Sequence, residues 1–226
     1  MIASSPAWLV LEDGTAYPGR SFGAARPSAG EVVFHTGLTG YQEILTDPSY
    51  RGQIVAMTAP QIGNYGICPA DAESAGVQVA GFVVRELSAR PSNWRSTISL
   101  PDYLAEAGVC GISGIDTRDL TIRIREHGAM QGVIVHGEAD LIAAVELARD
   151  VPSMEGQDLV PEVTCKEAYE WQGTPGVEAD PDFERVPDPV ADTVSVVVYD
   201  FGVKWNILRS LHGRNCKVTE IGRALV

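Results

Sequence analysis

The chain has 226 residues and a mass of 24.2 kDa, which fits one large domain or two small ones. Hydrophobic residues make up 45% of it and the mean hydropathy is +0.00, so we expect a globular protein with a buried core. The 17 basic and 30 acidic residues leave a net charge of −13, which disfavours nucleic acids and anionic membrane surfaces as partners. No apolar run approaches the roughly 20 residues of a membrane-spanning helix, and no signal peptide is visible, so the sequence predicts a cytoplasmic protein.

The four cysteines and four histidines are scattered along the chain, and no two cysteines form a C-x-x-C pair. This spacing predicts neither a zinc site nor a disulfide framework, so we expect reduced and mostly buried thiols. A catalytic cysteine usually lies at a helix N-terminus or beside a base, and none of the four shows either feature. The residues concerned are Cys68, Cys110, Cys165, Cys216, His35, His127, His136 and His212.

Residues 1–150 alternate short β-branched runs with amphipathic segments, a pattern that predicts one mixed α/β domain. The Asp13-Gly14 pair between two apolar runs predicts a hairpin, which makes the sheet mixed rather than purely parallel. Strands are expected at 8–12, 15–17, 31–34, 53–57, within 77–87, at 111–115 and at 131–136. Helices are expected at 100–107 with Ser99 as the N-cap, from Thr117 as a cap to Gly128 in the left-handed region, and at 139–149.

An acidic, proline-rich stretch from Asp150 to Asp192 follows this domain. It carries 12 acidic residues, two basic residues and six of the 14 prolines, so charge repulsion and proline should keep it extended. At least Gly173 to Asp192 is predicted to be a linker, and an acidic metal-binding or partner-binding tail is the alternative. We therefore divide the chain into a domain at 1–150, an acidic linker region at 151–192 and a second unit at 193–226.

The second unit begins with a nearly continuous β-branched run, Val194 to Tyr199, of the kind found in central strands covered on both faces. A turn at Asp200-Phe201-Gly202 leads into a helix that begins near Trp205 and ends at Gly213, and Cys216 to Ile221 forms the next strand. This β-α-β order predicts the opening of a doubly wound sheet. The turn spells the metal-binding triplet of protein kinases, but neither an H-R-D loop nor a glycine-rich phosphate loop accompanies it, which excludes a kinase.

The segment from Gly37 to Tyr50 concentrates glycine and hydroxyl residues between two expected strands and has little apolar periodicity. Loops of this kind on a rigid scaffold commonly contact a ligand or a partner. The Asp47-Pro48-Ser49 turn within it can present the Ser49 hydroxyl outward. Two interpretations stay open from the residues alone: a functional loop, or a local turn in which Ser49 caps the following backbone.

Several motifs stand in a fixed order along the chain. The most specific is Thr39-Gly-Tyr-Gln-Glu-Ile-Leu-Thr-Asp-Pro-Ser-Tyr50, because a run of twelve residues does not match by chance. The others, which extend to about Ile221, are Leu9 to Thr15, Gly30 to Phe34, Gln61 to Asn64, Gly114 to Arg118, Leu120-Thr121 and Tyr199 to Lys204. In sequence and spacing these motifs closely resemble the small, glutamine-hydrolysing subunit of carbamoyl-phosphate synthetase.

This resemblance implies that the N-terminal domain packs against the large synthetase subunit and that the second unit opens a class I glutamine amidotransferase domain. In the family, a Cys-His-Glu triad hydrolyses glutamine and the ammonia passes to the large subunit. The large subunit binds ATP and Mg and makes carbamoyl phosphate from bicarbonate for arginine and pyrimidine biosynthesis. The one glutamine-contacting residue that the family takes from its N-terminal domain matches Ser49, and no cofactor is expected in this chain itself.

The sequence also departs from the family pattern. The nucleophile elbow, the oxyanion glycines and the His-x-Glu pair would all lie beyond residue 226, and residues 222–226 no longer follow the pattern. No catalytic residue is assigned, and we expect an incomplete glutaminase subunit without turnover of its own, because thiolate, base and oxyanion hole are missing. The alternative is a non-catalytic docking module for the large subunit, which a chain that ends partway through a sheet favours less.

Overall fold

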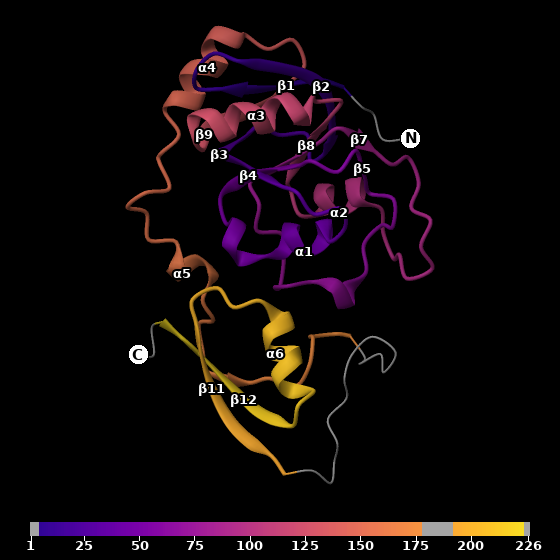
Figure 1. The fold of residues 1–226 in the computed structure, drawn as a ribbon, viewed down its shortest axis with the longest axis vertical. Coiled ribbons are helices and arrows are strands. Elements are labelled where there is room, and N and C mark those ends of the chain that lie inside the picture. The colour runs from indigo at the N-terminus through magenta and orange to yellow at the C-terminus, as the bar shows by residue number, and fades with distance from the viewer. Residues whose placement is uncertain (1–4, 178–191, 224–226) are drawn as a thin grey trace.

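The computed structural model of the chain describes residues 5–177 and 192–223. Its first part is built on β1 (Pro6–Leu11), β2 (Ala16–Gly23), β3 (Ser28–His35), β4 (Gln53–Met57), β6 (Gly81–Val84), β8 (Cys110–Ser113) and β9 (Met130–His136). These strands close into a barrel in the order β1-β2-β8-β6-β4-β3-β9 (Figure 1). The β1–β2 hairpin is confirmed, and the pairs β3–β4, β4–β6 and β6–β8 are parallel. The predicted mixed sheet is therefore present, and it is closed on itself.

Alternation along the barrel strands separates an inner apolar layer from an outer one. The helices are α1 (Tyr41–Thr46), α2 (Leu100–Glu106), α3 (Thr117–His127) and α4 (Leu141–Arg149). On β4, Ile54 belongs to the same buried cluster as Leu120 of α3, whereas the next residue, Val55, packs with Leu45 of α1 and Leu104 of α2. Helix α4 covers β1 and β9. Smaller elements are η1 (Pro48–Tyr50), η2 (Pro69–Asp71) and a two-stranded sheet of β5 (Gln61–Ile62) and β7 (Glu86–Leu87).

The helix boundaries follow local capping, with three corrections to the sequence prediction. Ser99 caps α2 as predicted, but the carboxylate of Asp116, not Thr117, caps α3, because a carboxylate accepts two N–H groups of the first turn. Helix α4 begins two residues later than predicted, after its cap Asp140. Gly128 ends α3 with φ 89° and ψ −179°, which is positive in φ but not left-handed helical. None of the helices in the described residues is long and apolar enough to cross a membrane.

The second unit is a three-stranded sheet in the order β10-β12-β11, with one helix against it (Figure 1). Its elements are β10 (Tyr169–Glu170), β11 (Val194–Asp200), α6 (Trp205–His212) and β12 (Cys216–Gly222). Strands β11 and β12 are parallel, which confirms the β-α-β prediction. The expectation of a strand covered on both faces does not hold for β11. It lies at the edge of this sheet, and Val197 and Tyr199 are 55% and 56% exposed.

Residues 151–177 differ from the extended, solvated chain that their composition predicts. They contain α5 (Val160–Val163) and β10, and Trp171 is buried in the core of the second unit with Leu208 and Val218. Composition misleads here because the acidic side chains face solvent while one large apolar side chain anchors the segment. Residues 178–191, which make up most of the predicted linker, lie outside the described residues.

Candidate functional site

Ser49, the one site residue predicted from the sequence, lies on the surface of the barrel in η1. The turn forms because the Asp47 carboxylate accepts the Ser49 backbone N–H at 2.9 Å and Pro48 occupies the first helical position. Asp47 thus has the capping role that the sequence left open for Ser49. The Ser49 hydroxyl makes no hydrogen bond within the described residues, so it is available to an external group.

The second unit meets the barrel at this turn. Gly202 follows β11 with φ +98°, and a Cβ built on it would lie 3.1 Å from the Cβ of Pro48. Because β11 and β12 are parallel, both strands end at the same edge of the small sheet. Ligands of open α/β sheets bind outside the carboxyl ends of their parallel strands. The fold therefore brings Ser49, from the barrel, to the edge of the second unit where such a ligand is expected.

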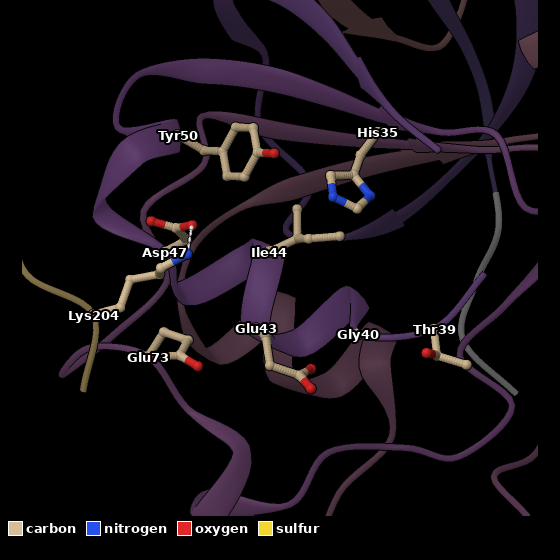
Figure 2. Close-up of a pocket in the computed structure, with 9 residues that line it drawn as sticks. All are labelled: His35, Thr39, Gly40, Glu43, Ile44, Asp47, Tyr50, Glu73 and Lys204. Carbon is tan, nitrogen blue, oxygen red and sulfur yellow. Dashed lines mark ion pairs between the residues drawn. The ribbon is translucent and has the colours of Figure 1, made fainter. Parts of the chain in front are cut away.

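A pocket of about 310 Å³ lies next to η1, between the barrel and the start of α6 (Figure 2). Lys204, the residue before α6, places its Nζ 3.6 Å from Oδ2 of Asp47. The rings of His35 and Tyr50 meet edge to face, with centroids 6.4 Å apart. The lining consists of His35, Thr39, Gly40, Glu43, Ile44, Asp47, Tyr50, Glu73 and Lys204. Three carboxyl groups and one amine give the pocket a polar lining.

The pocket contains a carboxyl group with shifted acidity. Burial raises the pKa of Glu43 above its usual range, and the negative charges of Asp71 and Glu73 act in the same direction. Oε2 of Glu43 is buried without a hydrogen-bond partner in the described part of the chain. Burial also raises the pKa of Tyr50, and the charge of Asp47 adds to this effect. Glu43 therefore stays protonated to a higher pH than an ordinary glutamic acid.

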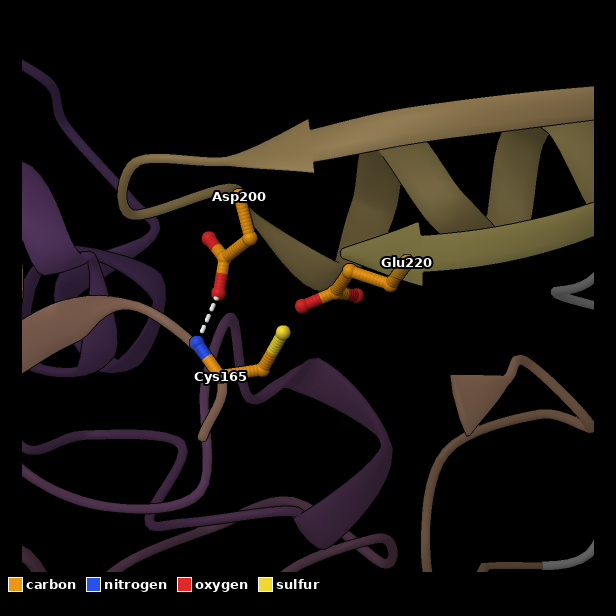
Figure 3. A group of neighbouring side chains, drawn as sticks. All are labelled: Cys165, Asp200 and Glu220. Atoms are coloured by element: carbon orange, nitrogen blue, oxygen red, sulfur yellow. Dashed lines mark hydrogen bonds between the residues drawn. The ribbon is translucent and has the colours of Figure 1, made fainter. Parts of the chain in front are cut away.

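A second group of reactive side chains lies in the small sheet, where Cys165, Asp200 and Glu220 converge (Figure 3). Their potential ligand atoms all lie within 4.8 Å of one another, and both carboxyl groups are buried. Zn²⁺ accepts thiolate and carboxylate ligands, so the residue types are suitable for a metal. However, Asp200 already accepts the backbone N–H groups of Cys165, Gly202 and Val203.

Glu220 of this group keeps its proton to a higher pH than an ordinary glutamic acid. Burial raises the pKa of Glu220 to about 7, and the negative charge of Asp200 raises it further. A hydrogen bond from Tyr169 acts in the opposite direction and lowers this pKa. The Tyr169 hydroxyl donates to Oε2 of Glu220 at 2.7 Å. Burial likewise raises the pKa of the Cys165 thiol to about 11. The hydrogen bonds of Asp200 and the raised pKa values of Glu220 and Cys165 both oppose the fully ionised ligand set that a metal would need.

The four cysteines are free thiols, and none has the surroundings of a nucleophile. All four cysteines and all four histidines lie in the described ranges, and no hydrogen bond there joins a cysteine to a histidine. Burial raises the pKa of Cys110 to about 11, which suppresses its thiolate at neutral pH.

Comparison with known proteins identifies the family. A profile of the carbamoyl-phosphate synthase small chain, CPSase domain, matches residues 9–134, more than half of the chain. The chain belongs to this family. The carbamoyl phosphate synthase small chain of Thioalkalivibrio sulfidiphilus is 51% identical over 218 residues, which cover 96% of this chain and 56% of that protein. The small chain of a Nostoc species is 53% identical over 220 residues, covering 94% of this chain and 55% of that protein. The chain thus spans a little over half the length of the curated relatives it matches.

Sequence reasoning found Ser49 and its turn but missed the pocket beside it. Lys204 and Glu73 come from segments far from Ser49, and no local pattern places them together. One signal was available: α6 begins after Lys204, whose side chain cannot accept a hydrogen bond, so its first turn needs a cap from elsewhere. The Cys165 cluster was also missed, because its members lie on three separate segments.

Proposed function

We propose that this chain acts in the small subunit of a carbamoyl phosphate synthase, which hydrolyses glutamine and supplies ammonia to the large subunit. The large subunit, with bound ATP and Mg, would then make carbamoyl phosphate from bicarbonate for arginine and pyrimidine biosynthesis in the cytoplasm. The barrel would dock on the large subunit, and Ser49 would hold glutamine from the barrel side. Membership of the family and the position of Ser49 support this assignment.

The observation that carries the proposal is the contact between η1 and the turn after β11. It brings Pro48, the residue before Ser49, against the turn that follows β11 at the carboxyl edge of the parallel pair β11–β12, which supports a role for the Ser49 hydroxyl at that edge. A hydroxyl in this position can donate a hydrogen bond to a carboxylate or accept one from an ammonium group, and glutamine carries both. In this chain, Ser49 binds and orients the substrate and takes no part in covalent chemistry.

We further propose that the 226-residue polypeptide does not hydrolyse glutamine by itself. Attack on the amide needs a thiolate, a base beside it and donors for the oxyanion. The described cysteines have no histidine partner, and the thiol pKa values of Cys110 and Cys165 are raised rather than lowered. The assay is glutamate release by the pure chain, and detectable turnover above a C110A/C165A double variant would overturn this part.

Reading the gene and its transcript across the codon for Val226, in all three frames, tests the wider assignment. A G-x-C-x-G elbow followed by a His-x-Glu pair would support a glutaminase subunit. A stop codon with neither motif downstream would favour the alternative, a non-catalytic docking module whose binding to a carbamoyl phosphate synthase large subunit would be measured instead.

The role of Ser49 is tested in the longest product that this gene encodes, reconstituted with the large subunit. We expect Ser49→Ala to raise KM for glutamine about tenfold with a smaller change in kcat, because the lost contact holds the substrate and not the transition state. Ser92→Ala is the matched control, since Ser92 is an exposed serine whose one hydroxyl hydrogen bond in the described ranges goes to the carbonyl of Asn64. Equal KM values for the two variants would contradict the assignment.

A further inference from the structure

Helix α6 begins without a cap of its own. The first N–H groups of a helix have no partner within the helix, and a side-chain acceptor at the N-cap normally satisfies one of them. In α6 the N-cap residue is Lys204, an amine that can only donate, and it makes no capping hydrogen bond. The acceptors for the first turn of α6 must therefore come from another part of the structure.

The barrel supplies them through a single residue, Glu73, in the loop that follows η2. Its backbone carbonyl accepts the N–H of Trp205 at 2.9 Å, and its Oε2 accepts the N–H of Asn206 at 2.9 Å. A carboxylate at this end of a helix also interacts favourably with the helix dipole. Glu73 is 7% exposed, so its carboxylate is held between the barrel and the second unit and is little screened by water.

Contacts on either side make this cap rigid. The Glu73 N–H donates to Oγ1 of Thr46 at 2.9 Å, which ties the loop to α1. Arg209, one turn further along α6, places Nη2 3.6 Å from Oε1 of Glu73, and both side chains of this pair are about nine-tenths buried. Nη1 of Arg209 donates to the carbonyl of Ala72 at 3.0 Å. Glu73 thus joins α1 of the barrel to the first turn of α6.

We propose that Glu73 is a positioning residue that caps α6 across the boundary between the barrel and the second unit and so places Lys204 over the pocket beside Ser49. This role rests on the proposed function, because Lys204 and Ser49 would then lie at the glutamine site. Lys204 is the residue before the first helical turn, so the cap holds its backbone, and its amine lies 3.6 Å from Oδ2 of Asp47. Glu73 itself needs no contact with the substrate.

The test compares two side chains of similar size at position 73 in the full 226-residue chain. Glu73→Gln keeps an oxygen that can accept the Asn206 N–H, whereas Glu73→Met fills the same space without one. Asp71→Asn is the matched control, because Asp71 lies two residues away and pairs with Arg95 within the barrel. The readouts are amide hydrogen exchange at Asn206 by NMR and the labelling rate of the Lys204 amine relative to Lys217, which pairs with Glu170 far from the cap.

We expect Glu73→Met to speed exchange at Asn206 about fivefold, the factor that loss of a helix N-cap gives, and to raise Lys204 labelling relative to Lys217. Glu73→Gln should restore most of the protection of both groups, and Asp71→Asn should match the unmodified chain. Rescue by glutamine separates capping from packing, because a space-filling role would not distinguish Gln from Met. Equal behaviour of the Gln and Met variants, or the same loss in Asp71→Asn, would overturn the proposal.

Neither readout uses glutamine, so the two proposals fail separately. If Glu73→Met loses protection at Asn206 but Ser49→Ala leaves KM unchanged, the capping role of Glu73 is supported and the role of Ser49 in glutamine binding is contradicted. If Glu73→Met leaves exchange at Asn206 unchanged but Ser49→Ala raises KM, the capping role of Glu73 is contradicted and the role of Ser49 in glutamine binding is supported.

Discussion

Loss of the Glu220 proton should make the second unit less stable as the pH rises. Glu220 is 3% exposed and faces Asp200, and its pKa is raised from 4.5 to about 7 by burial first and by the charge of Asp200 in addition. Below pH 4.5 the group is protonated in both the folded and the unfolded chain, so it has no effect on the pH dependence. Between the two pKa values the unfolded chain releases the proton and the folded chain keeps it. The stability that this proton provides is therefore lost as the pH rises through about 7.

The size of the effect follows from the shift. A rise from 4.5 to about 7 is worth about 3 kcal/mol at 1.36 kcal/mol per pKa unit, and most of it falls between pH 5 and 8. This is a large part of the about 5–15 kcal/mol by which a domain of this kind is stable. Glu220→Gln should abolish this component, because an amide stays neutral and can still accept the hydroxyl of Tyr169.

Urea unfolding at pH 5, 6, 7 and 8, followed by tryptophan fluorescence, measures the effect. Trp171 and Trp205 report on the second unit, where their rings lie 5.7 Å apart. The unmodified chain should lose stability relative to Glu220→Gln by about 2–3 kcal/mol over this range. Glu170→Gln is the control, because Glu170 lies on the neighbouring strand but is exposed and paired with Lys217. The reasoning is refuted if Glu220→Gln keeps the pH slope of the unmodified chain.

Three further substitutions test the packing around the site. Trp171→Ala should cost about 3–5 kcal/mol in urea unfolding of the second unit, because Trp171 is the largest side chain of its core, and an unchanged midpoint would show that the segment is not anchored. Gly202→Ala should reduce stability by more than Gly176→Ala, since both have positive φ but only Gly202 approaches Pro48, and equal losses would argue against that contact. Asp116→Ala should lower the barrel's stability by about 1 kcal/mol through the lost cap of α3, whereas Asp116→Asn, which keeps a side-chain acceptor, should not, and equal losses would argue against the cap.

Local elements of the fold were predictable because their signals are local. The strand at Gln53–Met57 and the cap at Ser99 are found where their residue types predict them. Closure of the barrel was not predictable in the same way. It depends on β9 pairing with β1 and β3, which are distant in sequence, and alternation along each strand is the same in an open sheet as in a closed one.

The candidate site was predictable only in part for the same reason. The Asp47-Pro48-Ser49 turn is written in three consecutive residues, so its shape and the exposure of Ser49 follow from the sequence. Its neighbours Glu73 and Lys204 belong to separate segments that tertiary packing brings together. The acidic stretch misled for a related reason: composition averages over a segment, whereas the structure buries one side chain of it, Trp171, against Leu208 and Val218.

The barrel and the second unit have separate apolar cores, and this determines how the site between them is held. The core of the second unit contains only residues from position 171 onward, and the barrel clusters contain none of these. No buried apolar cluster of the described residues spans the two parts, so their relative orientation depends strongly on directional contacts such as Glu73 with Arg209 and Lys204 with Asp47, while Arg51 with Glu162 ties the barrel to the connecting helix α5. The last two pairs are exposed enough for salt to screen them, while the Glu73–Arg209 pair is buried. The geometry between Ser49 and α6 should consequently depend far more on Glu73 than on the surface ion pairs.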